Sequence, residues 1–180
     1  MTTIEEKQLG IHLDEYKVLK SEQLRRIAVR DHVIYLTIAA VGAILGLVEK
    51  LGNNFLLLAI PWVGLLLGWT YLVNDQKVSA IGQYIRDTLD DQVKGILTIK
   101  QDAFGWETAH RDDKKRIARK RIQLFVDFLA FVVPGVVAAI AFITTSSWLN
   151  PLRVLAGVEL LLLLALGCQI WGYADLKKGK

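Results

Sequence analysis

Two acidic residues lie inside stretches that are otherwise apolar, and they are the first candidates for chemistry. Glu159 lies about two helical turns into the apolar run 152–173, and Asp127 lies in the first turn of the run 124–143. A carboxylate inside a bilayer costs roughly 2.5 to 3.5 kcal/mol unless it is protonated, paired or hydrated. The functional hypothesis for Glu159 is a polar or water-lined path, or a proton-sensitive element. The structural alternative is a hydrogen bond to Thr37 or another polar group across a helix interface, or a carboxyl group protonated in place. We interpret Asp127 as structural, because it can reach water or Lys120.

A basic cluster precedes the third apolar run. It could grip an anionic ligand such as a lipid headgroup, a nucleotide or a nucleic acid. The favoured interpretation is a cytosolic retention signal with an anionic-lipid contact, since no aromatic residues are interleaved to stack bases. The cluster consists of Arg111, Lys114, Lys115, Arg116, Arg119, Lys120 and Arg121.

Patterns typical of catalysis or cofactor binding are missing from the sequence. The three histidines, His12, His32 and His110, show no metal-ligand spacing, and Cys168 is the one cysteine. The chain contains no P-loop, no GxGxxG and no GxSxG. We therefore expect neither an enzyme nor a metal site or cofactor.

Four apolar runs position these residues: 33–48, 55–73, 124–143 and 152–173. Each, with its flanks, approaches the 20 or so residues that cross a bilayer. Short turns join the first run to the second and the third to the fourth. The predicted fold class is an all-α integral membrane protein, with four transmembrane helices in two hairpins.

The distribution of basic residues predicts the topology. Of the 22 Lys and Arg residues, six lie in 1–31, eleven in 74–121 and three in 175–180, while each short turn has one. Basic residues near spans stay in the cytoplasm. We therefore expect both termini and the middle block on the cytosolic side of a bacterial inner membrane, and the two short turns on the outer side. A soluble four-helix bundle is disfavoured, because so short a chain could not cover four such apolar helices.

Small residues and prolines mark where the spans should pack and bend. Gly42 and Gly46, and Gly64 and Gly68, are each four residues apart, a spacing that lets membrane helices approach closely. Pro61 predicts a bend in the second span, and Pro134 a break in the third. These small-residue faces favour a homo-oligomer.

Outside the spans we expect a cytosolic helical layer. Residues 1–31 have roughly helical apolar spacing, which favours a helix packed on the middle block over one lying on the membrane. In the connector 74–121, a helix leaves the membrane with an apolar stripe. The expected divisions are 1–31, 32–73, 74–121, 122–174 and the basic tail 175–180.

The same connector carries a motif that resembles a known group. The segment from Asn74 to Arg86, NDQKVSAIGQYIR, followed by Gly105-Trp106-Glu107, is similar to that of small, mostly uncharacterised bacterial membrane proteins. The motif positions are Asn74, Asp75, Ile81, Gly82, Tyr84, Ile85, Arg86, Gly105, Trp106 and Glu107. The architecture also resembles membrane subunits of anti-phage defence systems, namely the Kiwa-type membrane subunit and nucleotide-gated membrane effectors.

That likeness implies a non-enzymatic, oligomeric inner-membrane subunit of a defence or stress system. It would sense or signal through its cytosolic layer, with a cytosolic partner protein, and would perturb the membrane. One alternative is a small ion channel or transporter with Glu159 on the path. Another is a scaffold that binds anionic lipids.

Overall fold

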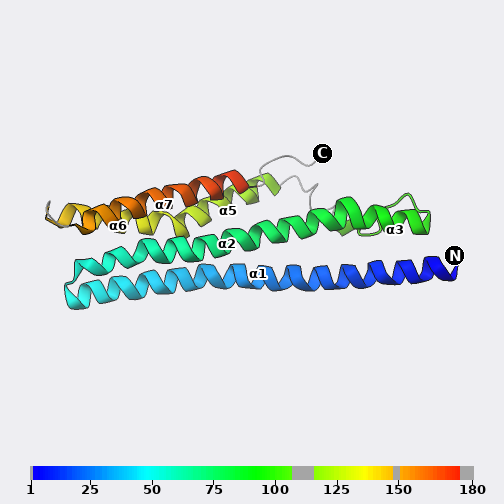
Figure 1. The fold of residues 1–180 in the computed structure, drawn as a ribbon, viewed down its shortest axis with the longest axis horizontal. Coiled ribbons are helices and arrows are strands. Elements are labelled where there is room, and N and C mark those ends of the chain that lie inside the picture. Colours follow the sequence, from blue (N-terminus) through cyan, green and yellow to red (C-terminus); the bar gives the residue numbers. More distant parts are fainter. Residues whose placement is uncertain (1, 107–115, 148–150, 175–180) are drawn as a thin grey trace.

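The computed structural model describes residues 2–106, 116–147 and 151–174, and this part of the chain is helical throughout except for its turns. Four of its helices are long and apolar enough to cross a membrane. They form two antiparallel hairpins that pack side by side over one half of an elongated molecule (Figure 1). The other half is a two-helix extension, which we call the stalk: residues 3–30 together with residues 76–97.

Helix α1 (Thr3–Leu51) runs through the stalk and the first span without a break. A capping box begins it: the Thr2 hydroxyl accepts from the Glu5 amide, and the Glu5 carboxylate accepts from the Thr2 amide. Gly52, with φ of 61°, ends it in the left-handed conformation that suits glycine. Its 49 residues span about 74 Å at ~1.5 Å per residue. The division expected at residue 31 is therefore no break in the helix.

The second long helix is continuous as well, although its geometry changes along its length. The 3-10 helix η1 (Asn54–Leu58), α2 (Ala59–Tyr84), the π-helix η2 (Ile85–Leu89) and α3 (Asp90–Leu97) join into one rod of 44 residues. Pro61 lies in the first turn of α2, just after the 3-10 helix η1, where its missing N–H costs little.

The predicted stripe of the stalk is confirmed. Ile85, Leu89 and Val93 are at most 2 % exposed, and this side of η2 and α3 packs against α1. At the tip of the stalk, Phe104 stacks on Tyr16 with ring centroids 4.3 Å apart. The segment 98–105 thus folds back onto α1, and the described residues before residue 32 pack on the connector, as the favoured interpretation expected.

The second hairpin consists of α5 (Arg116–Phe131), α6 (Val133–Thr145) and α7 (Leu152–Tyr173). Val132 separates α5 from α6 just before Pro134, but it stays in the right-handed helical region, so the predicted break is a local loosening of one helix. The two short turns lie at one end of the molecule, because the Asn54 amide reaches the Thr145 hydroxyl at 3.5 Å.

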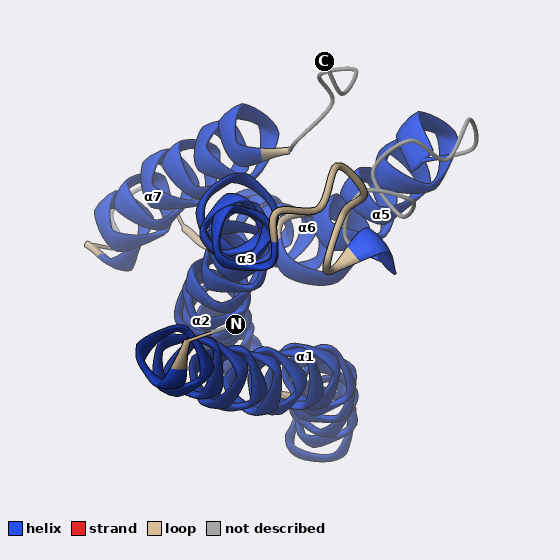
Figure 2. Ribbon diagram, turned by 90° about the vertical axis from the view of Figure 1, so that its right-hand side faces the viewer, coloured by secondary structure: helices blue, strands red, loops and turns tan. Residues whose placement is uncertain are grey.

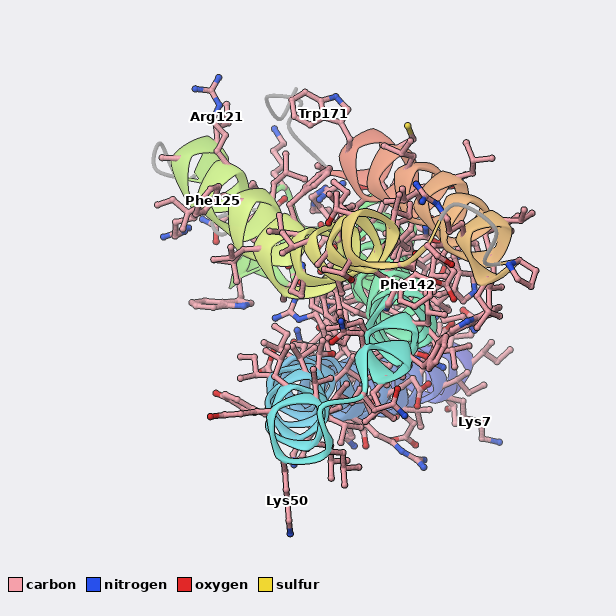
Figure 3. The ribbon with its side chains drawn as sticks, turned by 90° about the vertical axis from the view of Figure 1, so that its left-hand side faces the viewer. Lys7, Lys50, Arg121, Phe125, Phe142 and Trp171 are labelled. Atoms are coloured by element: carbon pink, nitrogen blue, oxygen red, sulfur yellow. The ribbon has the colours of Figure 1, made fainter. Side chains whose placement is uncertain are left out.

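Helix α2 occupies the centre of the apolar half. It has α1 on one side and α6 and α7 on the other (Figure 2). Seen from the turn end, Phe142 lies among the helices, whereas Lys50, Arg121, Phe125 and Trp171 point outward (Figure 3). Only 11 % of the apolar stretch of α1 is buried, against 33 % to 39 % in the other three, so α1 is the least covered span.

The glycines of the two predicted packing faces behave differently. A Cβ at Gly64 would meet the backbone carbonyl of Phe131, and one at Gly68 would lie 2.9 Å from Leu166 Cδ2. Gly64 and Gly68 therefore pack the two hairpins together. A Cβ at Gly42 or Gly46 would meet nothing within 4 Å, so that face is open.

Candidate functional site

A cluster of charged and polar side chains joins α1, α2 and α5 where the apolar spans meet the stalk. Asp75 on α2 lies at its centre: its Oδ1 accepts from Arg30 Nη1 of α1 at 2.9 Å and from Gln123 Nε2 of α5 at 3.3 Å. Lys120 Nζ, also on α5, lies 3.8 Å from Asp75 Oδ2. These residues, with Tyr71 and Asp127, form what we call the boundary cluster.

Asp127 is the acidic member of the boundary cluster that lies deepest among the apolar helices. Gln123 Nε2 also donates to the Tyr71 hydroxyl at 2.9 Å, and that hydroxyl interacts with the Asp127 carboxylate. Asp127 is only 6 % exposed, and its Oδ1 has no partner among the described residues. Asp127 is thus a buried acid whose direct partner is Tyr71, whereas Lys120, the partner considered from the sequence, lies beside Asp75.

A small cavity adjoins these groups. Asp75, Lys120, Gln123 and Asp127 line its polar side, and its volume is about 20 Å³. A polar cavity needs at least about 10 to 15 Å³ to hold a water molecule. The cavity can therefore hydrate the free oxygen of Asp127.

A second set of contacts locks α1 to α2 next to the cluster. Arg26 Nη1 donates to Asn74 Oδ1 at 3.2 Å, and Gln23 Nε2 donates to the Val78 carbonyl at 3.2 Å. Burial alone would lower the pKa of Arg30, but its hydrogen bond to Asp75 and the neighbouring acidic groups raise that pKa overall. The Arg30 guanidinium accordingly stays charged and paired.

Glu159 lies apart from the boundary cluster, in the turn half of α7. It is fully buried, and neither of its carboxyl oxygens has a hydrogen-bond partner in the described part of the chain. The Trp62 indole of α2 lies beside it. Thr37 is also buried, but its hydroxyl donates to the Val33 carbonyl of its own helix, so it does not supply the hydrogen bond considered for Glu159.

The motif in the connector does not assemble into a single site. Asn74 and Asp75 join the contacts at the boundary, whereas Ile81 and Ile85 belong to the stalk. The Tyr84 hydroxyl donates to Glu15 of α1 at 2.7 Å. The other described positions are Gly82, Arg86, which pairs with Asp87, and Gly105 and Trp106, which are exposed; Glu107 lies outside the described residues.

The structure describes only part of the predicted basic cluster. Arg111, Lys114 and Lys115 lie outside the described residues, and so does the side chain of Arg116. Arg119 and Arg121 are exposed on α5, and Arg121 points away from the bundle (Figure 3). Lys120 instead belongs to the boundary cluster, so an anion-binding surface would be built without it.

Sequence reasoning missed Arg30, Tyr71 and Gln123 as members of a site. Their spacing held a signal: Lys120, Gln123 and Asp127 lie on one face of a helix, and so do Tyr71 and Asp75. Among the described residues, no group of three or more His, Cys, Asp or Glu side chains converges to hold a metal ion.

The fold defines an all-helical chain with four helices able to cross a membrane, an extended stalk and a charged cluster between them. No family model, no curated protein and no solved structure matches this chain. The resemblance carried by the connector motif therefore stays a prediction.

Proposed function

We propose that the protein is a non-enzymatic subunit of a bacterial inner membrane that transmits a signal between a cytosolic partner and its membrane spans. One observation carries the proposal: both helices of the stalk continue without interruption into spans. A continuous helix is stiff, so a partner that displaces the stalk also displaces the spans.

The proposed orientation places the stalk in the cytosol. Its helices and the connector hold most of the Lys and Arg residues, whereas the two turns at the opposite end hold one each. Cysteines introduced at Asn53 in a turn and at Lys17 in the stalk test this directly. An impermeant thiol reagent added to intact cells should label the first and not the second; labelling of both from one side would contradict the orientation.

The boundary cluster provides the coupling between the two hairpins. Asp75 on a stalk helix holds Arg30 of the other stalk helix, and it also holds Lys120 and Gln123 of α5. Movement of the stalk therefore reaches α5 through one shared carboxylate.

The biological role that we propose is a defence or stress response, with the charged stalk as the receiving surface. The test is phage plating on cells carrying the gene with its neighbours, as wild type, as Asp75→Asn and as Asp31→Asn. Asp31 makes a weaker contact with Arg30 and is about half exposed, so it is a matched control. We expect protection by the wild type and the control and its loss in Asp75→Asn. An equal efficiency of plating on all strains, including those without the gene, would contradict this role.

A small ion channel is the second candidate, favoured by the two buried acidic residues Glu159 and Asp127. The cavity beside Asp127 does not include Glu159, so the two acids do not share one opening. Ion flux into liposomes containing the purified protein, abolished by Glu159→Gln, would favour the channel over the signalling subunit.

A further inference from the structure

Glu159 is fully buried, among apolar side chains and beside the Trp62 indole, whose N–H is a hydrogen-bond donor. On α7 it lies between Ala156 and Leu163, which are fully buried as it is. The turn half of α7 packs with Phe142 and Ala139 of α6 and with Leu58 of η1, and Figure 3 shows Phe142 among these helices. An exposed acid could sample water, but this one has no exposed surface.

The elements around Glu159 supply no charge to balance a carboxylate. Helix α6, η1 and residues 59–70 of α2 contain no Asp, Glu, Lys, Arg or His. On α7 itself the nearest charge is Arg153, almost two turns away, which donates to the Ser146 carbonyl at 3.3 Å. The next ionisable groups, Tyr71 on α2 and Asp127 on α5, belong to the boundary cluster.

The remaining choice is between a proton and a metal cation as the neutralising ligand. Hard cations take about six oxygen ligands, and α6, η1 and residues 59–70 of α2 contain no carboxylate or histidine to join Glu159. The neighbouring backbone carbonyls lie within helices, where they accept hydrogen bonds from their own turns. A proton needs only the carboxylate oxygen itself.

We propose that Glu159 is a proton-binding site inside the helical bundle, loaded while α2, α6 and α7 are packed and emptied when they separate. In the packed state the carboxyl group is neutral. On separation the O–H bond breaks, the proton passes to water, and the carboxylate is hydrated. Proton release and bundle opening are therefore one event, independent of whether the stalk signals to a partner.

The sign of the pH dependence follows from this linkage. Glutamate in water is ionised above about pH 4.3, so above that pH the opened state lacks a proton that the packed state holds. Raising the pH therefore favours opening, by up to about tenfold in the opening constant for each pH unit.

The first experiment measures unfolding equilibria in detergent micelles from about pH 5 to about pH 8 for three proteins. Wild type and Glu49→Gln, which removes an exposed carboxyl group, should show the same dependence on pH. In Glu159→Gln the unfolding constant should rise less steeply with pH, by up to about tenfold less for each pH unit, because the amide cannot release a proton. Equal slopes for wild type and Glu159→Gln would overturn the proposal.

Infrared spectroscopy reads the protonation state directly. The wild-type spectrum at neutral pH should contain a carbonyl band of a protonated carboxyl group that is missing from Glu159→Gln and present in Glu49→Gln. Glu159→Ala, which needs no polar partner, replaces the Gln variant if that variant does not fold. Carboxylate bands in place of the protonated band in the wild-type-minus-variant spectrum would show an ionised Glu159 and refute the site.

Discussion

Replacing Gly64 by alanine should damage the joint between the two hairpins far more than the same change at Gly42. A Cβ at Gly64 would run into the Phe131 backbone carbonyl and would also come within 3.7 Å of Leu163 Cδ2. A Cβ at Gly42 would meet no atom within 4 Å. The two glycines lie in the same kind of spacing on neighbouring helices, so they form a matched pair.

The expected magnitude follows from what would have to move. Overpacking a tight contact costs about 1 to 3 kcal/mol, and the upper end applies here because a backbone carbonyl cannot rotate away as a side chain can. Alanine is favoured over glycine in a helix by about 1 kcal/mol. Gly64→Ala should therefore destabilise the protein by about 2 kcal/mol, whereas Gly42→Ala should be neutral or stabilising. Gly68→Ala should fall between them, because its contacts are side-chain atoms of Leu166 and Phe131.

The assay is the free energy of unfolding in mixed detergent micelles, measured at a protein concentration where the chain is monomeric. The order of stability should be Gly42→Ala, then Gly68→Ala, then Gly64→Ala. If Gly64→Ala and Gly42→Ala unfolded at the same denaturant fraction, the hairpins would not meet at Gly64, and the arrangement of α2 against α5 and α6 would be wrong.

Three further predictions use other parts of the molecule. Asp75→Asn should lower the free energy of unfolding by about 1 to 3 kcal/mol, between the values for surface and buried ion pairs, while Asp31→Asn should change it by less than about 0.5 kcal/mol. Lys94 donates hydrogen bonds to Asp102 and Asp90, and these bonds raise the pKa of Lys94 above its ordinary 10.5. The contact of residues 98–105 with the stalk should therefore be complete below that pH and be lost only as the pH rises further. Hydrogen exchange of the Phe104 amide, which donates to Asp90 at 2.7 Å, reports this contact, and Lys94→Met should speed that exchange below that pH. Gly42→Ile should weaken self-association in crosslinking experiments if the open face of α1 binds a second copy, whereas unchanged crosslinking would place any oligomer contact elsewhere.

The general features of the fold were predictable because the burial of apolar surface imposes simple patterns on the sequence. Four apolar runs, two short turns and the stripe Val78, Ile81, Ile85, Leu89 and Val93 each reflect one dominant force, the burial of apolar surface. The continuity of α1 was harder to predict. At residues 30–33 the sequence changes from charged to apolar, and such a change was interpreted as a division of the chain. None of these residues breaks a helix, so α1 continues through them.

The boundary cluster was only partly predictable, because it depends on long-range pairing. Asp127 was visible as an acid in an apolar run, but Asp75 was noted only as part of a motif, and Arg30 was simply one of many basic residues. Their meeting requires α1 alongside α2 and the close approach of α2 to α5, where Gly64 and Gly68 pack against Phe131. Helix periodicity places a residue on a face of its own helix, but it does not indicate which other helix covers that face.

The two joints between the hairpins differ in kind, and this difference determines how a stalk movement would travel. At Gly64 the backbones of α2 and α5 touch, and a close-packed backbone contact resists sliding. At the boundary cluster Asp75 shares its oxygens among Arg30, Lys120 and Gln123, and these partners can exchange. We therefore expect α2 to pivot at Gly64, with the largest displacement relative to α5 at Asp75 and little at the turn end. Spin labels across Asp75 and α5 should then report a larger distance change than labels across the two turns when a partner binds the stalk, and equal changes at both ends would mean that the hairpins move as one rigid body.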